Sequence, residues 1–210
     1  MKYERYERDN MSAAERDLDF VLGEGEEILW QGKPKKKAYI LNKVFAMLPI
    51  ALLWAAFDSV FLFFVFGFDT PPVVRIIVTV FICVHLLPFW IWLSNVLTAS
   101  KRHSNIGYAL TNRRILIRGG LVGVEMQSVS YKDIENVNLR IGLFDRLLKV
   151  GDLYFQSPTS RGKTIFFDVE DPYGVYKIAQ KIVADIQTDI AFPNAYRPEE
   201  NAGYQTKYRP

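Results

Sequence analysis

The sequence predicts an α+β membrane protein in which a two-helix transmembrane hairpin carries a small antiparallel β-barrel capped by a C-terminal helix. Three observations predict this fold. Two long apolar runs, 44–68 and 73–97, are separated by a turn of four residues. Short strand-like segments with turn signals between them follow over 106–169. After the last of these, apolar residues recur at helical spacing over 175–190.

Each apolar run contains about 25 residues, and at about 1.5 Å per residue it can cross a hydrocarbon core of about 30 Å. A helix buried in a soluble bundle does not need so long an unbroken apolar stretch. A buried hairpin of this kind is nevertheless the alternative interpretation. We predict that 44–97 form a transmembrane hairpin.

Basic residues flank this hairpin on both outer sides. They are Lys35, Lys36, Lys37, Lys101 and Arg102. The 69–72 turn between the two runs carries no positive charge. Since Lys and Arg near membrane spans favour the cytoplasmic side, both termini are predicted to be cytoplasmic. The protein is then a multi-pass plasma-membrane protein, and 1–43 form a cytoplasmic N-terminal segment.

Two ionisable residues lie within the predicted spans. Asp58 is near the middle of the first and His85 is near the middle of the second. Counted from the turn, an antiparallel hairpin places them at similar depth. Ionisable side chains inside a membrane usually face a partner. One interpretation is a hydrogen-bonded pair that locks the hairpin. The other is a proton or ion relay, or a contact with another membrane protein.

The part of the chain after the hairpin is predicted to contain about six strands. They are 106–110, 113–118, 121–131, 134–139, 152–157 and 163–169, with a polar turn containing Pro158, Ser160 and Gly162 before the last. The connection 143–150 is expected to bury Leu143, Phe144, Leu147 and Leu148.

A C-terminal helix is predicted from Asp171 as N-cap and Pro172 as the first helical residue. Its apolar stripe consists of Val175, Ile178, Ala179, Ile182, Val183, Ile186 and Ile190. These observations define a domain over 104–190, and the polar tail 191–210 is predicted to be disordered.

Before the hairpin, Ile28-Leu29-Trp30 reads as a short strand bounded by glycines and a proline. A three-residue strand is not stable alone. Because the hairpin returns the chain to its starting side, we predict that this segment docks on an open edge of the barrel. The alternative places Trp30 among lipid headgroups. For 12–22 the sequence leaves two interpretations, a short helix with Ser12 as its cap or a partly ordered tail.

The predicted strand 113–118 carries three arginines. Alternation places Arg114 and Arg118 on one face and Arg113 on the other. With the lysines and arginine that flank the hairpin, they form a candidate basic surface. This surface either faces anionic lipid headgroups or a partner, or is a solvated face that follows membrane topology.

The sequence offers no catalytic constellation. The histidines are His85 and His103, and Cys83 is the single cysteine, so a Ser-His-Asp arrangement outside the membrane and a cysteine-based zinc site are excluded. No phosphate-binding loop is present. The carboxylates of Asp168 and Asp171 are better explained by helix capping than by a metal. We expect no cofactor, no metal and no enzymatic activity, and a net charge of +3 does not indicate nucleic acid.

An ordered set of motifs resembles the bacterial pleckstrin-homology-like (PH-like) domain of YdbS-type membrane proteins. The set includes Gly107-Tyr108-Ala109-Leu110-Thr111-Asn112-Arg113-Arg114-Ile115, Arg118-Gly119-Gly120-Leu121, Gly151-Asp152-Leu153 and Asp171-Pro172. The resemblance covers about 104–190. It implies a seven-stranded, partly open barrel with a capping helix and no enzymatic activity, so the seventh strand is either missing or supplied by 28–30.

These observations predict a non-enzymatic binding and assembly module that is anchored at the cytoplasmic membrane face. Its expected partners are the lipid bilayer and other membrane proteins or a second copy of itself. The alternative, motivated by Asp58 and His85, is a subunit of an export or toxin-resistance membrane complex.

Overall fold

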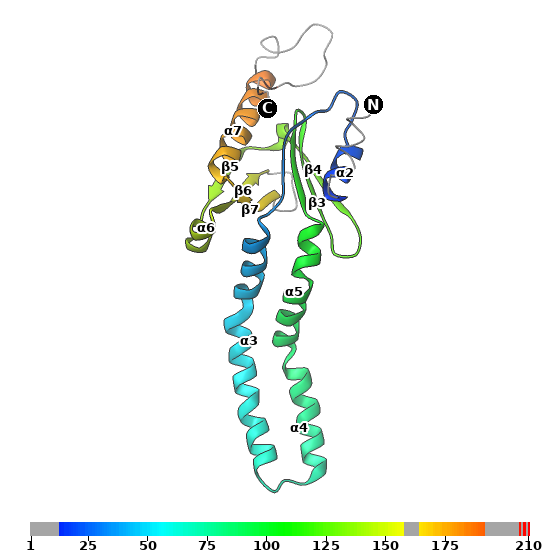
Figure 1. Ribbon diagram of the computed structural model, residues 1–210, viewed down its shortest axis with the longest axis vertical. Coiled ribbons are helices and arrows are strands. Elements are labelled where there is room, and N and C mark those ends of the chain that lie inside the picture. Colours follow the sequence, from blue (N-terminus) through cyan, green and yellow to red (C-terminus); the bar gives the residue numbers. More distant parts are fainter. Residues whose placement is uncertain (1–12, 158–163, 192–205, 207, 209) are drawn as a thin grey trace. The chain divides into compact units, whose positions relative to one another are not determined.

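A computed structural model describes residues 13–157, 164–191, 206, 208 and 210. The chain divides into two compact units. The β-rich unit comprises Met1–Tyr39 and Lys101–Pro210, and the helical unit comprises Ile40–Ser100. The elements of both units are labelled in Figure 1.

Seven antiparallel strands in two sheets form the β-rich unit. The four-stranded sheet has the order β1 (Ile28–Gly32), β2 (Gly107–Thr111), β3 (Arg114–Gly119) and β4 (Glu125–Ser130). The three-stranded sheet has the order β5 (Asn136–Arg140), β6 (Val150–Gln156) and β7 (Thr164–Glu170). The predicted strands are all found, with ends that differ by up to four residues.

The predicted docking of the segment before the hairpin is confirmed. β1 pairs antiparallel with β2, and Trp30 lies opposite Leu110. The half-buried Trp30 ring stacks on Phe166 of β7 with a centroid distance of 5.8 Å. The seventh strand therefore comes from the N-terminal side of the helical unit.

The closed barrel is not confirmed, because the strands form two separate sheets. Between β4 and β5 the chain makes the 3-10 turn η1 (Tyr131–Asp133), which redirects it so that β5 begins a new sheet beside β6. On the opposite edges the two sheets approach each other through a bridge between Pro34 and Val169.

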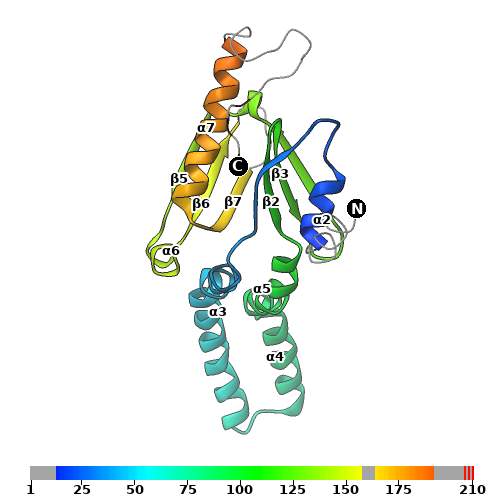
Figure 2. The ribbon, with the colours of Figure 1, turned by 45° about the horizontal axis from the view of Figure 1, so that its top comes forward.

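The helix α7 (Pro172–Ala191) packs on the three-stranded sheet, where it contacts β5, β6 and η1 (Figure 2). Gly174 N–H donates to the Asp171 carboxylate at 3.2 Å, so the predicted N-cap is confirmed. Ile182 is fully buried in the main core with Tyr108 and Phe166. Within the predicted stripe, Ile190, in the last turn of the helix, is exposed.

A second, smaller core lies on the outer face of the four-stranded sheet. The helix α2 (Ala13–Phe20) packs there on β2 and β3, and Leu18 is buried against Ala109 and Leu116. The predicted cap Ser12 and the predicted turn at 158–162 lie outside the described residues. So does most of the tail, although Thr206 Oγ1 donates to Asp185 at 2.8 Å.

The helical unit contains most of α3 (Lys36–Gly67), all of α4 (Pro72–His85) and most of α5 (Leu87–Ser104). By length and composition, α3 can cross a membrane, and α4 and α5 pass the same test as a pair bent by 50°. Pro88 lies directly after the break between α4 and α5, and a proline there lacks the N–H that would continue the helical ladder. Pro49, by contrast, lies inside an unbroken helix.

The predicted burial of the 143–150 connection is wrong for three of its four residues, and the fourth, Leu148, is half-buried. The segment forms the short helix α6 (Leu143–Leu148), whose start is capped by a bond from Gly142 N–H to Asp145 at 2.8 Å. As a helix, it projects Leu143, Phe144 and Leu147 into solvent instead of laying them over the core.

Candidate functional site

The chain leaves the β-rich unit at Tyr39 and returns to it at Lys101. We call residues 34–39 and 101–105 the junction. Within it, His103 Nε2 lies 2.7 Å from Pro34 O. Because a carbonyl oxygen only accepts, Nε2 carries the hydrogen. The buried His103 ring also lies 5.8 Å from the Tyr39 ring. The segment that leaves the β-rich unit and the segment that returns to it are thus hydrogen-bonded directly to each other.

Lys35 fixes the outgoing side of the junction. Its backbone N–H donates to Asp168 O at 2.8 Å, and its ammonium group lies 3.0 Å from Glu170 Oε1. The same ammonium group donates to Leu148 O, at the end of α6, at 3.2 Å. The start of α3 is therefore tied both to β7 and to α6.

The remaining predicted basic residues separate into two groups. Five of them are exposed: Lys36, Lys37, Lys101, Arg102 and Arg113. Arg114 and Arg118 are engaged in ion pairs inside the β-rich unit, so they contribute little to a basic surface.

Arg114 and Arg118 bind two acidic residues of the N-terminal segment. The Arg114 guanidinium group makes two bonds of 2.9 Å to the Glu26 carboxylate, and Arg118 donates to Asp17 Oδ2 at 2.7 Å. Arg118 is only 4% exposed, which corrects its assignment to the surface. Burial raises the pKa of Glu26, but bonds from Arg114, from Gly23 N–H and from Thr111 together hold it below its usual value.

Sequence reasoning missed two groups of exposed apolar side chains. The first, the α6 tip, consists of Leu143, Phe144 and Leu147, which are 90%, 65% and 80% exposed. The second, the β3–β4 tip, consists of Val122 and Val124, which are 91% and 57% exposed. Both groups lie in short segments that are rich in apolar residues and adjacent to glycines. This pattern was the signal in the sequence that could have pointed to them.

Both tips lie at the end of the β-rich unit where α3 begins and α5 ends (Figures 1 and 2). Two bonds hold them there. Lys35 holds the α6 carbonyl Leu148 O, and Asn105 Nδ2 donates to Gly120 O, before the β3–β4 tip, at 3.2 Å. Each tip is thus attached to one side of the junction.

In the helical unit, Asp58 and His85 face each other. His85 Nδ1 lies 2.8 Å from Asp58 Oδ1, and the Asp58 side chain is buried. The rings of Trp54, Phe57 and Phe81 lie within 6.0 Å of the His85 ring, centroid to centroid. Asp58 Oδ2 has no hydrogen-bond partner among the described residues. This geometry is that of a hydrogen-bonded pair between α3 and the end of α4.

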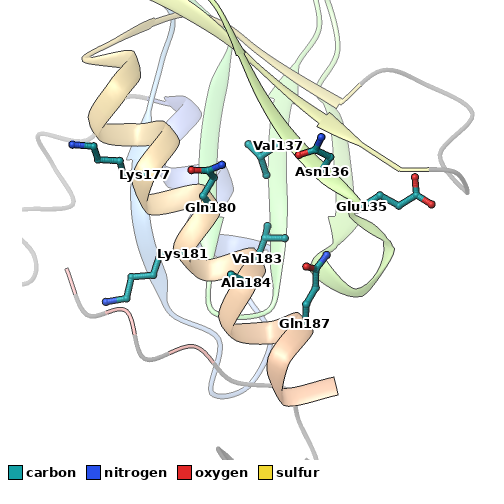
Figure 3. A pocket seen from close by; sticks show the side chains of 9 residues that line it. All are labelled: Glu135, Asn136, Val137, Lys177, Gln180, Lys181, Val183, Ala184 and Gln187. Carbon is teal, nitrogen blue, oxygen red and sulfur yellow. The ribbon is translucent and has the colours of Figure 1, made fainter. Parts of the chain in front are cut away.

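A groove of about 490 Å³ runs between α7 and β5 (Figure 3). Gln187 Nε2 donates to Ile134 O at 2.8 Å and joins its two walls. Among the described strands, β5 pairs with β6 and with no other, so β5 is an edge strand of its sheet. The lining side chains are Glu135, Asn136, Val137, Lys177, Gln180, Lys181, Val183, Ala184 and Gln187.

The side chains that line the groove can form hydrogen bonds with a polar polypeptide segment. The lining brings together amide, ammonium and carboxylate groups, with a few apolar side chains at its floor. Across the described residues, no group of three His, Cys, Asp or Glu side chains is placed to hold a metal ion.

A comparison with protein families gives one match, to the family described as "Bacterial PH domain", over residues 44–182. No curated protein matches the chain. Among solved structures, the chain is similar to a DUF1696 family protein with a pleckstrin-homology domain from Shewanella loihica PV-4. That similarity has 16% identity and a TM-score of 0.30, and it covers 37% of this chain and 71% of that one. Because the family model matches more than half of the length of this chain, the chain belongs to the bacterial PH domain family.

Proposed function

We propose that this protein is a membrane-anchored, non-enzymatic binding and assembly module at the cytoplasmic face of the plasma membrane. The pairing of β1 with β2 carries the proposal. Since β1 precedes the helical unit and β2 follows it, one folded domain holds both ends of that unit. A PH domain attached in this way stays at the membrane surface.

The same pairing supports a hairpin that crosses the membrane twice. Both ends of the helical unit belong to one domain, so they lie on one side of the membrane. A segment with both ends on one side crosses an even number of times. Within the described residues, α3 is the one unbroken helix long and apolar enough to cross. The bent pair α4 and α5 then provides the return crossing.

The exposed cations of the junction support the cytoplasmic orientation. Lys36, Lys37, Lys101 and Arg102 lie where the helices meet the β-rich unit. Near an anionic leaflet, each such cation contributes about 1 kcal/mol. Both termini and the PH domain are accordingly cytoplasmic, and the 69–72 turn is outside.

In this arrangement the Asp58–His85 pair is a lock between the two halves of the hairpin. Polar bonds between membrane helices contribute about 0.6 kcal/mol on average and up to about 2 kcal/mol. Three aromatic rings surround the His85 ring, which stays 31% exposed, whereas the Asp58 side chain is 3% exposed. The role of the pair is then to fix the register of α3 against α4.

The groove between α7 and β5 is the surface at which we place a protein partner. Its occupant is an extended segment of another membrane protein, since an outer strand can accept a further strand along its free edge. The side chains of Gln180 and Asn136, on opposite walls, then contact that segment (Figure 3).

Site-specific photo-cross-linking in native membranes tests this assignment. A photo-reactive residue is placed at Gln180, in the groove, and at exposed Ser128 on β4 as the matched control. We expect a discrete cross-linked partner from Gln180 and none from Ser128, and mass spectrometry then identifies the cross-linked segment. Equal cross-linking at both positions contradicts the assembly role. So does the absence of cross-linking at both positions, if no other protein co-purifies with this one from the same membrane.

A second candidate is a subunit of an export or toxin-resistance complex. One observation favours it: Asp58 Oδ2 is buried without a partner among the described residues, as in a site that awaits a proton or another chain. In that case Asp58→Leu and His85→Leu abolish export or resistance while the protein still accumulates in membranes. Full activity of both variants eliminates this candidate.

A further inference from the structure

We propose that the α6 tip and the β3–β4 tip insert into the interface of the lipid bilayer that holds the hairpin. The inference rests on the proposed function, because it assumes that the helical unit spans that bilayer. The occupant of both apolar surfaces is then lipid, at the level where headgroups meet acyl chains.

The exposure of the tips is the first argument. Leu143, Phe144 and Leu147 cluster on a single short helix, and each is at least 65% exposed. An exposed apolar cluster of this kind usually marks a surface that contacts a membrane or a partner. Single exposed apolar residues need no such explanation, but three on one helix do.

The position of the tips is the second argument. Lys35, which holds Leu148 O at the end of α6, immediately precedes α3. Asn105, which holds Gly120 O before the β3–β4 tip, immediately follows α5. The tips are therefore bonded to the two places where the chain passes toward the membrane. An apolar group at that level meets lipid before it meets any soluble protein.

The charges around the tips are the third argument. Arg146 and Lys149 are exposed on and directly after α6, and Lys101 and Arg102 are exposed in the junction, a few residues before Asn105. Apolar side chains flanked by cations are typical of surfaces that bind anionic bilayers. Three points of attachment, the hairpin and two tips, would hold the domain in one orientation.

Fluorescence quenching in reconstituted vesicles tests the inference on the full chain. Cys83 is replaced by Ser, and an environment-sensitive dye is attached through Leu147→Cys on α6 or Val122→Cys on the β3–β4 tip. Lys177→Cys on exposed α7 is the matched aqueous control, and Phe61→Cys in α3 reports insertion of the hairpin. The vesicles contain phosphatidylcholine and phosphatidylglycerol, and nitroxide lipids quench from within the bilayer while iodide quenches from water.

We expect the dyes at Leu147 and Val122 to be quenched by the nitroxide lipids at a depth of about 5–10 Å and to be protected from iodide. The dye at Lys177 should show the opposite pattern. Iodide quenching at the tips equal to that at Lys177, with Phe61 quenched by lipid, overturns the inference and leaves the proposed anchoring intact.

Two other outcomes also overturn it. Protection from iodide without quenching by nitroxide lipid means that a second copy of the chain covers the tips. A dye at Phe61 that lipid does not quench removes the membrane anchor itself, and the inference fails together with the proposed function.

Discussion

Gly32 is the last residue of the edge strand β1, and its replacement by alanine gives the sharpest stability prediction. A Cβ atom at this position would lie 2.6 Å from both Cη2 and Cζ2 of the Trp30 ring. That ring cannot simply swing away, because it stacks on Phe166. Forcing extra atoms into a packed site costs about 1–3 kcal/mol. Gly32→Ala should therefore loosen β1 from β2.

Hydrogen exchange of the β1 and β2 amides in the full-length protein measures this change. A loss of about 1–3 kcal/mol corresponds to exchange that is about 5- to 150-fold faster. Gly119→Ala is the matched control, because nothing lies within 4 Å of a Cβ added there. Exchange in Gly32→Ala that equals exchange in Gly119→Ala would refute the packing of Trp30 over Gly32.

Three further predictions concern single side chains. Ile182→Asp places an unpaired carboxylate in the main core and should lower the free energy of unfolding by about 4 kcal/mol, measured by limited proteolysis, whereas Lys181→Asp on the exposed face should stay near wild type. Asp58→Ala removes the partner of His85 and should lower the melting temperature of the hairpin in detergent, while Asp58→Asn should largely preserve it. The pKa of Glu26 is lowered below 4.5, so its ionised form stabilises the fold at neutral pH and this contribution is lost as the pH falls through the lowered value. Glu26→Gln should thus flatten the acid dependence of unfolding, and an unchanged acid dependence would contradict the ion pair.

The sequence was informative wherever one pattern dominated a segment. The hydrophobic period over 175–190 predicted α7 and the burial of Ile182, because a stripe of that width has to face a core. The isolated strand at 28–30 required a sheet, and the topology of the hairpin left the four-stranded sheet as its neighbour. Asp58 and His85 were expected at one depth, and the structure brings them to 2.8 Å.

The remaining features depend on contacts between distant segments. Nothing local in 113–118 indicates that Glu26 and Asp17 would neutralise two of its arginines, since these pairs form across about 90 to 100 residues of sequence. The apolar residues of 143–148 were predicted to be buried because composition alone does not distinguish a buried apolar side chain from an exposed one. The break into two sheets also depends on η1, a turn of three residues without a strong sequence signal.

The central claim is that the helical unit crosses the membrane twice and returns to the domain it left. Cysteine labelling of intact cells measures this directly, in a Cys83→Ser background with Thr70→Cys in the turn and Lys132→Cys on exposed η1 as separate variants. An impermeant maleimide should label the cysteine at Thr70 from outside, and should reach the one at Lys132 only after the membrane is permeabilised. If the two positions are labelled from the same side, the helical unit does not span the membrane as a hairpin.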